Sequence, residues 1–136
     1  MPTITIATAP LTGSRRRAIA LRITRWLTER DIAAGHVVVR FEVADDSLVF
    51  TGGWPVDALP ATAGELHHAS VTVCVGPQRD EAFRAELAAH IAATLGLTER
   101  TAFFYLEFRT TPPSEVYVAA AGPLRRTDLL AKEGTP

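Results

Sequence analysis

The sequence predicts an α/β fold in which two tandem β-α-β units form a four-stranded mixed sheet with two helices on one face. Three observations support this prediction: segments in which side-chain character alternates, two segments with apolar residues at helical spacing, and recurrence of the whole pattern after about 65 residues. The chain has 136 residues, and 47% of them are hydrophobic, which suits one small domain with a buried core. The predicted domain contains a first unit at 2–54, a second unit at 69–123 and a C-terminal tail at 124–136.

The first unit begins with a strand at 3–8, where β-branched and small residues alternate. Pro10 and Gly13 interrupt this pattern, and Ser14 is a suitable N-cap for the helix that follows. This helix has one apolar face, formed by residues at spacings of three and four. They are Ile19, Ile23, Trp26 and Leu27. The arginines at 15–17 lie off this face, so we expect them to form a solvated or interface patch.

A second strand is expected at 36–43, because HVVVRFEV is too apolar to be exposed on both faces. A turn and a short strand at 48–51 follow, and Gly52 and Gly53 end the unit. Residues 55–69 contain two prolines and show no clear period, so we interpret them as a connection.

The second unit repeats this order. We expect a strand at 70–75, a helix that begins at Arg79 and ends before Gly96, a strand at 101–108 and a strand at 116–120. Apolar residues at spacing four mark the buried face of the helix; they are Phe83, Leu87, Ile91 and Leu95. With both helices on one side, the other sheet face must be buried in some other way, and an oligomer is the simplest solution.

The composition excludes several classes of protein. Fourteen Lys and Arg against fifteen Asp and Glu give a net charge of −1, so the basic excess of a generic nucleic-acid or acidic-membrane binder is absent. A single cysteine, Cys74, excludes an internal disulfide framework and a cysteine-based zinc site, and its strand context favours a core position. His67 and His68 are adjacent in the connection and are unsuited to chelating one metal, so no metal site is expected. The chain has no apolar run of transmembrane length and no secretory pattern at its start, so we expect a cytoplasmic protein.

Four features of the sequence occur together in one known arrangement. Pro2 follows the initiator methionine and opens the first strand, and the β-α-β unit is duplicated. The other two features are the stretches VRFEV…VFTGG at 39–53 and SVTVCVGPQRDEAFRAELAAHIAATL at 70–95. Over residues 2–124 the chain resembles the tautomerase superfamily, including 4-oxalocrotonate tautomerase, cis-3-chloroacrylic acid dehalogenase and malonate semialdehyde decarboxylase. The resemblance implies a tautomerase (MIF-like) fold, a homotrimer, and cofactor-independent catalysis by an N-terminal proline on a small carbonyl or carboxylate substrate.

Removal of the initiator methionine would leave Pro2 with a free secondary amine. An α-amino group titrates near ~8, and an apolar pocket beside cations lowers its pKa toward neutrality. A base poised near ~7 can remove a proton α to a carbonyl and return it elsewhere. If the methionine is retained, the nitrogen is an amide and cannot act as a base, so a non-catalytic, ligand-binding protein is the alternative.

The resemblance also implies roles for Arg79 and Tyr105. Arg79 stands at the spacing of an arginine that reaches the proline of the other half and would hold a substrate carboxylate; otherwise it is a solvated first-turn residue. Tyr105 falls on the strand whose tyrosine orients water in the dehalogenase; otherwise it packs with its hydroxyl satisfied.

Three further residues are candidates for substrate binding: Arg40, His36 and Trp54. Arg40 lies in an apolar strand, where a charge needs either a substrate or a partner such as Glu42, two residues along. His36 begins its strand, a place where histidines are usually just exposed. Trp54 follows the glycine pair and would wall either an apolar pocket or an oligomer contact.

The sequence departs from the family where more demanding chemistry is required. The helical histidine of the dehalogenase falls on Leu27, and its water-activating glutamate falls near Ala119 or Ala120. The aspartate of the decarboxylase falls near Gly35 or His36. Keto–enol isomerisation of a small 2-oxo acid is therefore the expected reaction, with hydration, dehalogenation or decarboxylation on the same scaffold as the alternative.

Overall fold

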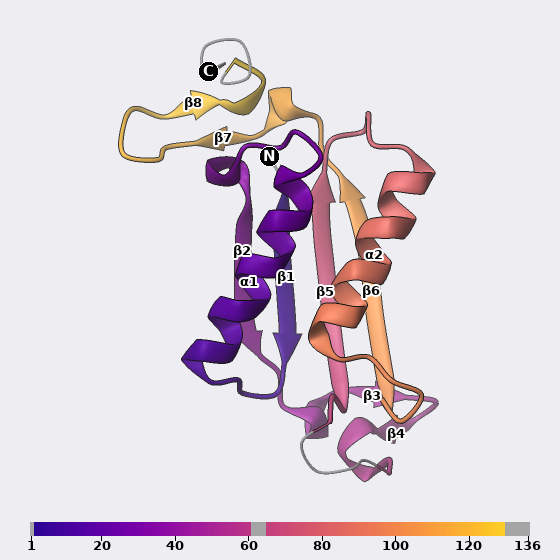
Figure 1. The fold of residues 1–136 in the computed structure, drawn as a ribbon. Helices are drawn as coiled ribbons and strands as arrows, with labels where there is room; N and C mark the ends of the chain where they lie inside the picture. The colour runs from indigo at the N-terminus through magenta and orange to yellow at the C-terminus, as the bar shows by residue number, and fades with distance from the viewer. Residues whose placement is uncertain (1, 61–64, 130–136) are drawn as a thin grey trace.

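The computed structural model describes residues 2–60 and 65–129, and its centre is a four-stranded sheet (Figure 1). The strands are β1 (Thr3–Thr8), β2 (Val38–Val43), β5 (His68–Val75) and β6 (Phe103–Thr110). They stand in the order β2-β1-β5-β6. The outer pairs are parallel, and β1 and β5 meet antiparallel in the middle. The predicted mixed sheet built from two β-α-β units is confirmed.

The two halves of the sheet share the same internal register. Thr3 is opposite Val38 in the first half and His68 is opposite Phe103 in the second, at equal separations along the chain. Because β1 and β5 are antiparallel, the strand starts of the two halves lie at opposite ends of the sheet. Each end therefore combines the start of one unit with the carboxyl end of the other unit's strands.

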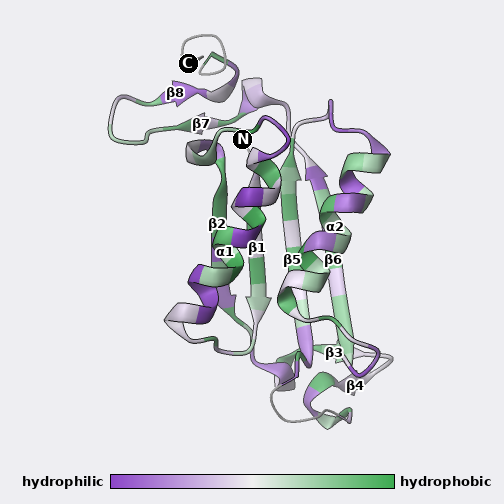
Figure 2. Cartoon of the chain, in the orientation of Figure 1, coloured by the Kyte–Doolittle hydropathy of each residue, from purple (hydrophilic) through white to green (hydrophobic). Residues whose placement is uncertain are grey.

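Two helices, α1 (Gly13–Thr28) and α2 (Glu81–Leu95), cover the same face of the sheet (Figure 1). They share one core with the central strands. Its fully buried members include Ile19, Ile23 and Leu27 of α1, Leu87 and Ile91 of α2, and Ile4, Ile6, Val71 and Val73 of the sheet. Figure 2 shows the apolar residues of β1 and β5 beneath the helices. Burying one such side chain contributes about 1.5–3 kcal/mol, so the shared core holds the two units together as one body.

Both helices begin at side-chain caps that differ from the expected ones. Thr12 caps α1, and its hydroxyl accepts a hydrogen bond from the Arg15 N–H at 3.1 Å, so the prediction of Ser14 as the cap is wrong. Asp80 caps α2 and accepts from the Phe83 N–H at 2.8 Å, so this helix begins after Arg79 and not at it. An aspartate is the stronger cap of that pair of neighbours, which is why it prevails over Arg79.

The connections contain more structure than the sequence predicted. Short 3-10 helices follow α1 and each β-α-β unit: η1 (Ala34–His36), η2 (Asp46–Leu48), η3 (Val56–Ala58) and η4 (Pro113–Glu115). Each unit also carries a small hairpin, β3 (Phe50–Thr51) with β4 (Trp54–Pro55), and β7 (Tyr117–Val118) with β8 (Arg125–Arg126). The strands expected at 36–43, 48–51 and 116–120 are shorter than predicted. Strand β5 begins at His68, within the connection expected at 55–69. Residues 61–64 of that connection lie outside the described residues.

Equivalent backbone bonds close the two hairpins. The Val56 N–H donates to the Val49 carbonyl at 2.7 Å, and the Thr127 N–H donates to the Val116 carbonyl at 2.8 Å. The β7–β8 hairpin lies near the N-terminal end of β1, and the β3–β4 hairpin lies at the opposite end of the sheet (Figure 1). Arg125 and Arg126, which the sequence assigned to the tail, therefore belong to a hairpin near the start of β1.

The sheet face away from the helices carries small side chains at its centre, most of them polar. They are Thr3, Thr5 and Ala7 of β1 and Ser70, Thr72 and Cys74 of β5, all half-buried in the single chain. The expectation that Cys74 belongs to the core is wrong, because strand alternation places its neighbours Val73 and Val75 beneath the helices instead. Among the described residues, neither helix and neither hairpin packs against this face, so it is open in the single chain.

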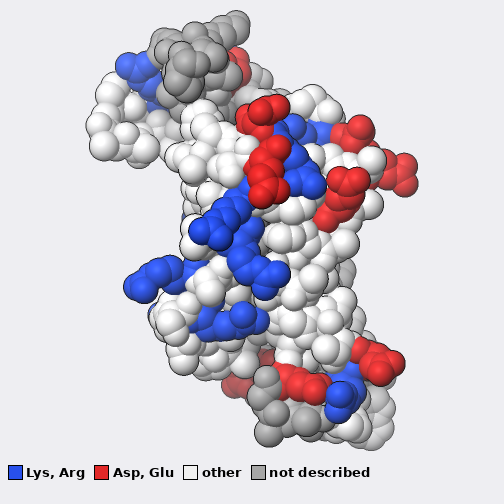
Figure 3. Space-filling model, in the orientation of Figure 1, with Lys and Arg blue, Asp and Glu red and all other residues white. Residues whose placement is uncertain are grey.

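Arginines follow the outer surface of α1, as Figure 3 shows in blue. The exposed set is Arg15, Arg16, Arg17, Arg22 and Arg25. The side chains of the first two are tied down by backbone carbonyls: Arg15 donates to Thr94 at 3.1 Å, and Arg16 donates to Leu11. No described helix is both long enough and apolar enough to cross a membrane.

Candidate active site

Pro2 lies at the start of β1, at the end of the sheet where the first strand begins and the strands of the second unit end. It is buried, and its carbonyl accepts a hydrogen bond from the Val38 N–H at 3.0 Å. Thr3 is opposite Cys74 in the antiparallel pair, so Pro2 lies beside Val75 at the carboxyl end of β5. The first residue of one unit is thus held against the strand end of the other unit.

A cavity of about 190 Å³ lies at this end of the sheet. Four segments wall it: the start of β1, the end of β5, the segment after β6 with η4, and the residue directly after β8. The lining residues are Thr3, Cys74, Val75, Gly76, Thr111, Pro113, Val116 and Thr127. Thr127 fixes two walls to each other, since its hydroxyl donates to the Pro113 carbonyl at 2.7 Å. The described walls are apolar or carry hydroxyl or thiol groups, and none of them is a carboxylate.

Pro2 and Arg79 lie at the same end, but neither is among the residues that line this cavity. The Arg79 N–H donates to the Gly76 carbonyl at 3.2 Å, and the Arg79 guanidinium carbon lies 4.9 Å from the centre of the Phe83 ring. The Gln78 side chain lies against the cavity wall instead: a Cβ added at Gly76 would be 2.1 Å from its Oε1 atom. The segment between β5 and α2 therefore provides the Gln78 amide next to Gly76 and the Arg79 guanidinium stacked on Phe83.

The structure brings His36, like Arg79, to the Pro2 end and leaves Arg40, Tyr105 and Trp54 farther away. His36 is half-buried in η1, just before Val38. Arg40 is opposite Thr5, about 10 Å along β1 from Pro2 at 3.3 Å per residue. Tyr105 and Trp54 lie farther still within one chain.

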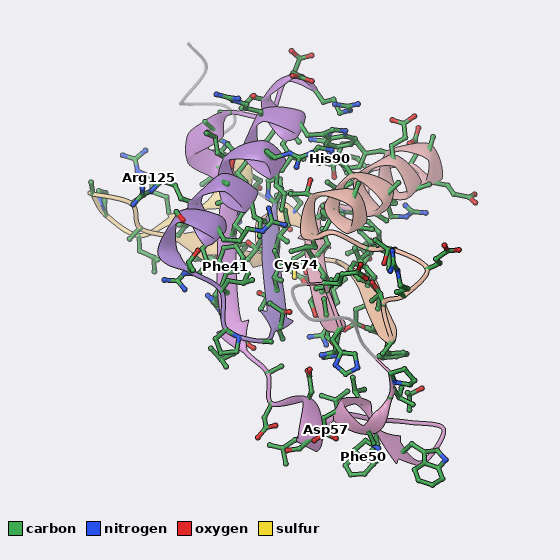
Figure 4. The ribbon with its side chains drawn as sticks, turned by 60° about the horizontal axis from the view of Figure 1, so that its bottom comes forward. Phe41, Phe50, Asp57, Cys74, His90 and Arg125 are labelled. Carbon is green, nitrogen blue, oxygen red and sulfur yellow. The ribbon has the colours of Figure 1, made fainter. Side chains whose placement is uncertain are left out.

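Tyr105 is opposite Ser70, which is opposite Ala7, so it is about 17 Å along the sheet from Pro2. Its ring is 48% exposed and its hydroxyl donates to Glu107 at 3.2 Å. Trp54 is 67% exposed in β4, at the end of the sheet where Figure 4 labels Phe50 and Asp57. The two remaining candidates thus have no contact with the Pro2 cavity of their own chain.

Most of the residues in the cavity wall were not among those predicted from the sequence. Thr111, Pro113 and Val116 lie in the segment after β6, which corresponds in the repeat to the segment after β2. The repeat could therefore have predicted that these residues lie at this end of the sheet. Thr127 had no such signal, because it reaches the cavity through a hairpin of two residues per strand.

A second cavity, of about 390 Å³, lies at the other end of the sheet. It is formed by the segment from Thr8 to Leu11, the end of β2 from Phe41 to Val43, and Arg16. Although it is larger, its cation is already bound to the Leu11 carbonyl, and it lies at the end of β1 opposite to Pro2. We therefore place the candidate active site at the smaller cavity beside Pro2.

Two histidines and an aspartate gather where the second unit begins. Asp46 of η2 lies 3.5 Å from Nδ1 of His67 and 3.4 Å from Nδ1 of His68. His68 is 1% exposed, its Nε2 lies 3.0 Å from the Ser70 hydroxyl, and its ring stacks on Phe103. Among residues 2–60 and 65–129, no three His, Cys, Asp or Glu side chains are grouped as a metal site.

Burial lowers the pKa of His68 from its ordinary value of 6.5, and the nearby Asp46 carboxylate opposes this effect without cancelling it. The folded chain therefore favours neutral His68, so stability from this site is complete above pH 6.5 and falls as the pH drops below it. We expect the melting temperature to fall further between pH 7.5 and about 5.5 in the wild type than in His68→Gln, measured by circular dichroism. His90→Gln on α2 is the control and should behave like the wild type; equal pH dependence in all three chains would contradict the prediction.

No protein-family model matches the chain, and no curated protein matches it. Solved structures do match. The chain is similar to a structure described as fused 4-OT wild type asymmetric trimer, with a TM-score of 0.66 and 16% identity over 95% of this chain and 98% of that one. It is similar to a member of the cis-3-chloroacrylic acid dehalogenase family, with a TM-score of 0.69 and 15% identity over 97% and 89%. It is also similar to a malonate semialdehyde decarboxylase, with a TM-score of 0.61 and 17% identity over 100% and 99%. Because these likenesses cover nearly the whole of every chain, the protein has the tautomerase-superfamily fold that its sequence predicted.

Proposed function

We propose that this protein is a cofactor-independent enzyme that isomerises the enol and keto forms of a small 2-oxo acid or related carbonyl compound. The observation that supports the proposal most is the place of Pro2, buried at the start of β1 beside a small cavity. The fold agrees with it, since proteins similar in structure are described as a fused 4-OT, a dehalogenase family member and a decarboxylase.

Pro2 would act through its nitrogen once the methionine is removed. The neutral amine takes a proton from the carbon α to the carbonyl, which breaks a C–H bond, forms an N–H bond and leaves an enolate. The same N–H then returns the proton to a different atom of the substrate. Apolar walls such as Val75 and Val116 disfavour the charged ammonium and so favour a neutral base.

The charges of the substrate and the enolate need partners at this end of the sheet. Arg79 would hold the carboxylate after turning from its stacked position on Phe83, and the Gln78 amide would donate a further hydrogen bond. His36 lies at the same end and completes the polar set. Hydration and dehalogenation need a carboxylate that activates water, and the described cavity walls supply none.

The remaining candidates enter the proposal through a second copy of the chain. Arg40, Tyr105 and Trp54 lie away from Pro2 in their own chain, so any lining role comes from a neighbouring copy. We propose a homotrimer, since the open sheet face needs cover and two structural relatives are described as trimers. Cys74 is a free thiol, which suits the reducing cytoplasm where we place the protein.

The first experiment measures the intact mass of the purified protein and its activity together. We expect the mass to lack one methionine residue. We also expect the protein to accelerate the conversion of the enol form of phenylpyruvate, or of 2-hydroxymuconate, to the corresponding keto form. A retained methionine, or a free Pro2 without activity on either compound, would overturn the proposal.

Gly76→Ala tests the Gln78 amide without touching its side chain directly. The new Cβ needs the space of the Gln78 Oε1 atom, so the amide must move away from the wall. We expect kcat/KM to fall about 5-fold, since one hydrogen bond is worth about 1 kcal/mol, while the melting temperature changes little. Gln78→Ala should give the same loss. Full activity in Gly76→Ala would remove Gln78 from the site.

A further inference from the structure

The outer surface of α1 carries positive charge that nothing within the described chain neutralises. The helix holds five arginines and no aspartate or glutamate over its 16 residues. Arg17, Arg22 and Arg25 are exposed, and their side chains make no hydrogen bond or ion pair with any described residue. These three residues form an arginine stripe. Because the whole chain has a net charge of −1, the remainder of it is acidic, and the total hides this local concentration of cations.

The arginine stripe points away from the core. Ile19, Ile23 and Leu27 are the buried residues of α1, and at 3.6 residues per turn the stripe lies on the other side of the helix. From Arg17 to Arg25 it extends about 12 Å along the axis, at 1.5 Å per residue. Figure 3 shows the stripe within the blue surface over α1. Since both helices cover the sheet face opposite the open one, the stripe stays in solvent when the open face is covered.

This charge works against the helix that carries it. The arginines at 15–17 lie near the positive end of the helix dipole with no acidic residue in the first turn, and Arg22 and Arg25 repel each other at a spacing of three. Helix α2 follows the opposite rule, with Asp80 as its cap and Glu81 in its first turn. Because the two helices hold the same place in the repeat, the fold does not require the charge of α1. A negatively charged partner outside the chain would compensate it.

A nucleic acid fits this surface poorly. Glu29 follows α1 directly, and Figure 3 shows acidic residues beside the upper end of the blue surface, so a long polyanion would meet carboxylates. A net charge of −1 also gives no long-range attraction to such a polymer. The aromatic ring of α1 is unavailable for base stacking, because the Arg30 guanidinium carbon lies 3.4 Å from the centre of the Trp26 ring and His90 stacks on the same ring.

A membrane surface fits poorly as well. Interfacial helices insert an apolar face between lipid headgroups, and the apolar face of α1 is already used by the core. Leu21, which is 49% exposed, is the large apolar side chain of α1 that lies outside the core. The surface therefore suits a short anionic segment that contacts guanidinium groups and inserts nothing.

We propose that the arginine stripe of α1 binds a short acidic segment of another protein, with carboxylates of that segment paired with Arg17, Arg22 and Arg25. A guanidinium group matches a carboxylate in two parallel hydrogen bonds, which makes arginine well suited to this contact. An extended segment rises about 3.4 Å per residue, so about four residues span the stripe, and alternate side chains point to the same side. The inference uses no residue of the candidate active site and does not depend on the proposed reaction.

Fluorescence anisotropy tests the contact with a labelled peptide that alternates glutamate and serine. We expect the peptide to bind at low salt and to weaken as salt rises to about 0.15 M, where the screening length is about 8 Å. A matched peptide with glutamine in place of glutamate should not bind. Combining Arg22→Gln with Arg25→Gln should weaken binding at least about 10-fold. Combining Arg100→Gln with Arg109→Gln removes the same charge from two other exposed arginines and should leave binding unchanged.

Charge reversal keeps the test decisive. Combining Arg22→Glu with Arg25→Glu should abolish binding of the glutamate peptide and create binding of a peptide that alternates lysine and serine, which an unfolded chain would not do selectively. Circular dichroism checks the fold of each variant. Absence of binding to the glutamate peptide, or equal loss in the Arg100 and Arg109 control, would overturn the inference. Tighter binding of a DNA duplex or of phosphatidylserine vesicles, lost in the same α1 variants, would assign the stripe to that partner and overturn the acidic segment.

Discussion

Replacing Pro2 with alanine is expected to lower kcat/KM for the enol-to-keto reaction by about 100-fold or more. Alanine leaves a primary amine on a flexible end, whereas the proline ring fixes the direction of the nitrogen lone pair. Proton transfer needs a near-attack geometry, so loss of that direction should lower kcat more than it raises KM. Stopped-flow absorbance at several substrate concentrations separates the two constants.

A serine inserted between Met1 and Pro2 makes a sharper comparison. It leaves the proline ring in the sequence but converts its nitrogen to an amide, so activity should fall at least as far as in Pro2→Ala. Pro10→Ala is the matched control, because Pro10 is exposed in the segment after β1 and lines the other cavity. Wild-type rates in Pro2→Ala or in the inserted variant would exclude Pro2 as the base.

The fold could be predicted from the sequence because its strongest patterns are those of the buried layer. Ile4 and Ile6 alternate with threonines in β1, and Val71 and Val73 alternate with polar residues in β5. Burial of one face fixes the pairing register of such strands, since a shift by one residue would expose all of their apolar side chains to solvent. The caps were less predictable, because Thr12 and Ser14 carry the same kind of hydroxyl and their choice depends on the entry of the chain into α1.

The candidate site could be predicted in part. The repeat places Arg79 at the end of the sheet where Pro2 begins, because the start of one unit meets the strand end of the other. Tyr105 falls on a strand of the correct repeat position, but its distance from Pro2 depends on the register of two strand pairs, which the sequence does not encode locally. Thr127 reaches the cavity through a short hairpin whose pairing no periodicity marks.

Arg79→Ala is expected to lower kcat/KM by about 10–100-fold, chiefly through a higher KM. A hydrogen bond to a charged group is worth about 1.5–3 kcal/mol, and the carboxylate of the substrate loses that partner in the ground state and the transition state alike. The fold should be nearly unaffected, since the stacking of Arg79 on Phe83 contributes about 0.5–1 kcal/mol. Arg25→Ala, an exposed arginine of α1, is the matched control, and unchanged KM in Arg79→Ala would remove Arg79 from the site.

Mixing the Pro2→Ala and Arg79→Ala chains shows which copy supplies the arginine. Pro2 and Arg79 lie at the same end of one sheet, joined through Val75 and Gly76, so we expect both to serve the same site of the same chain. In an assembly of the two variants no site would then contain both residues, and the activity should stay at the sum of the two separate chains. Recovery of activity on mixing would place Arg79 opposite the Pro2 of a neighbouring copy, across an interface rather than within one sheet.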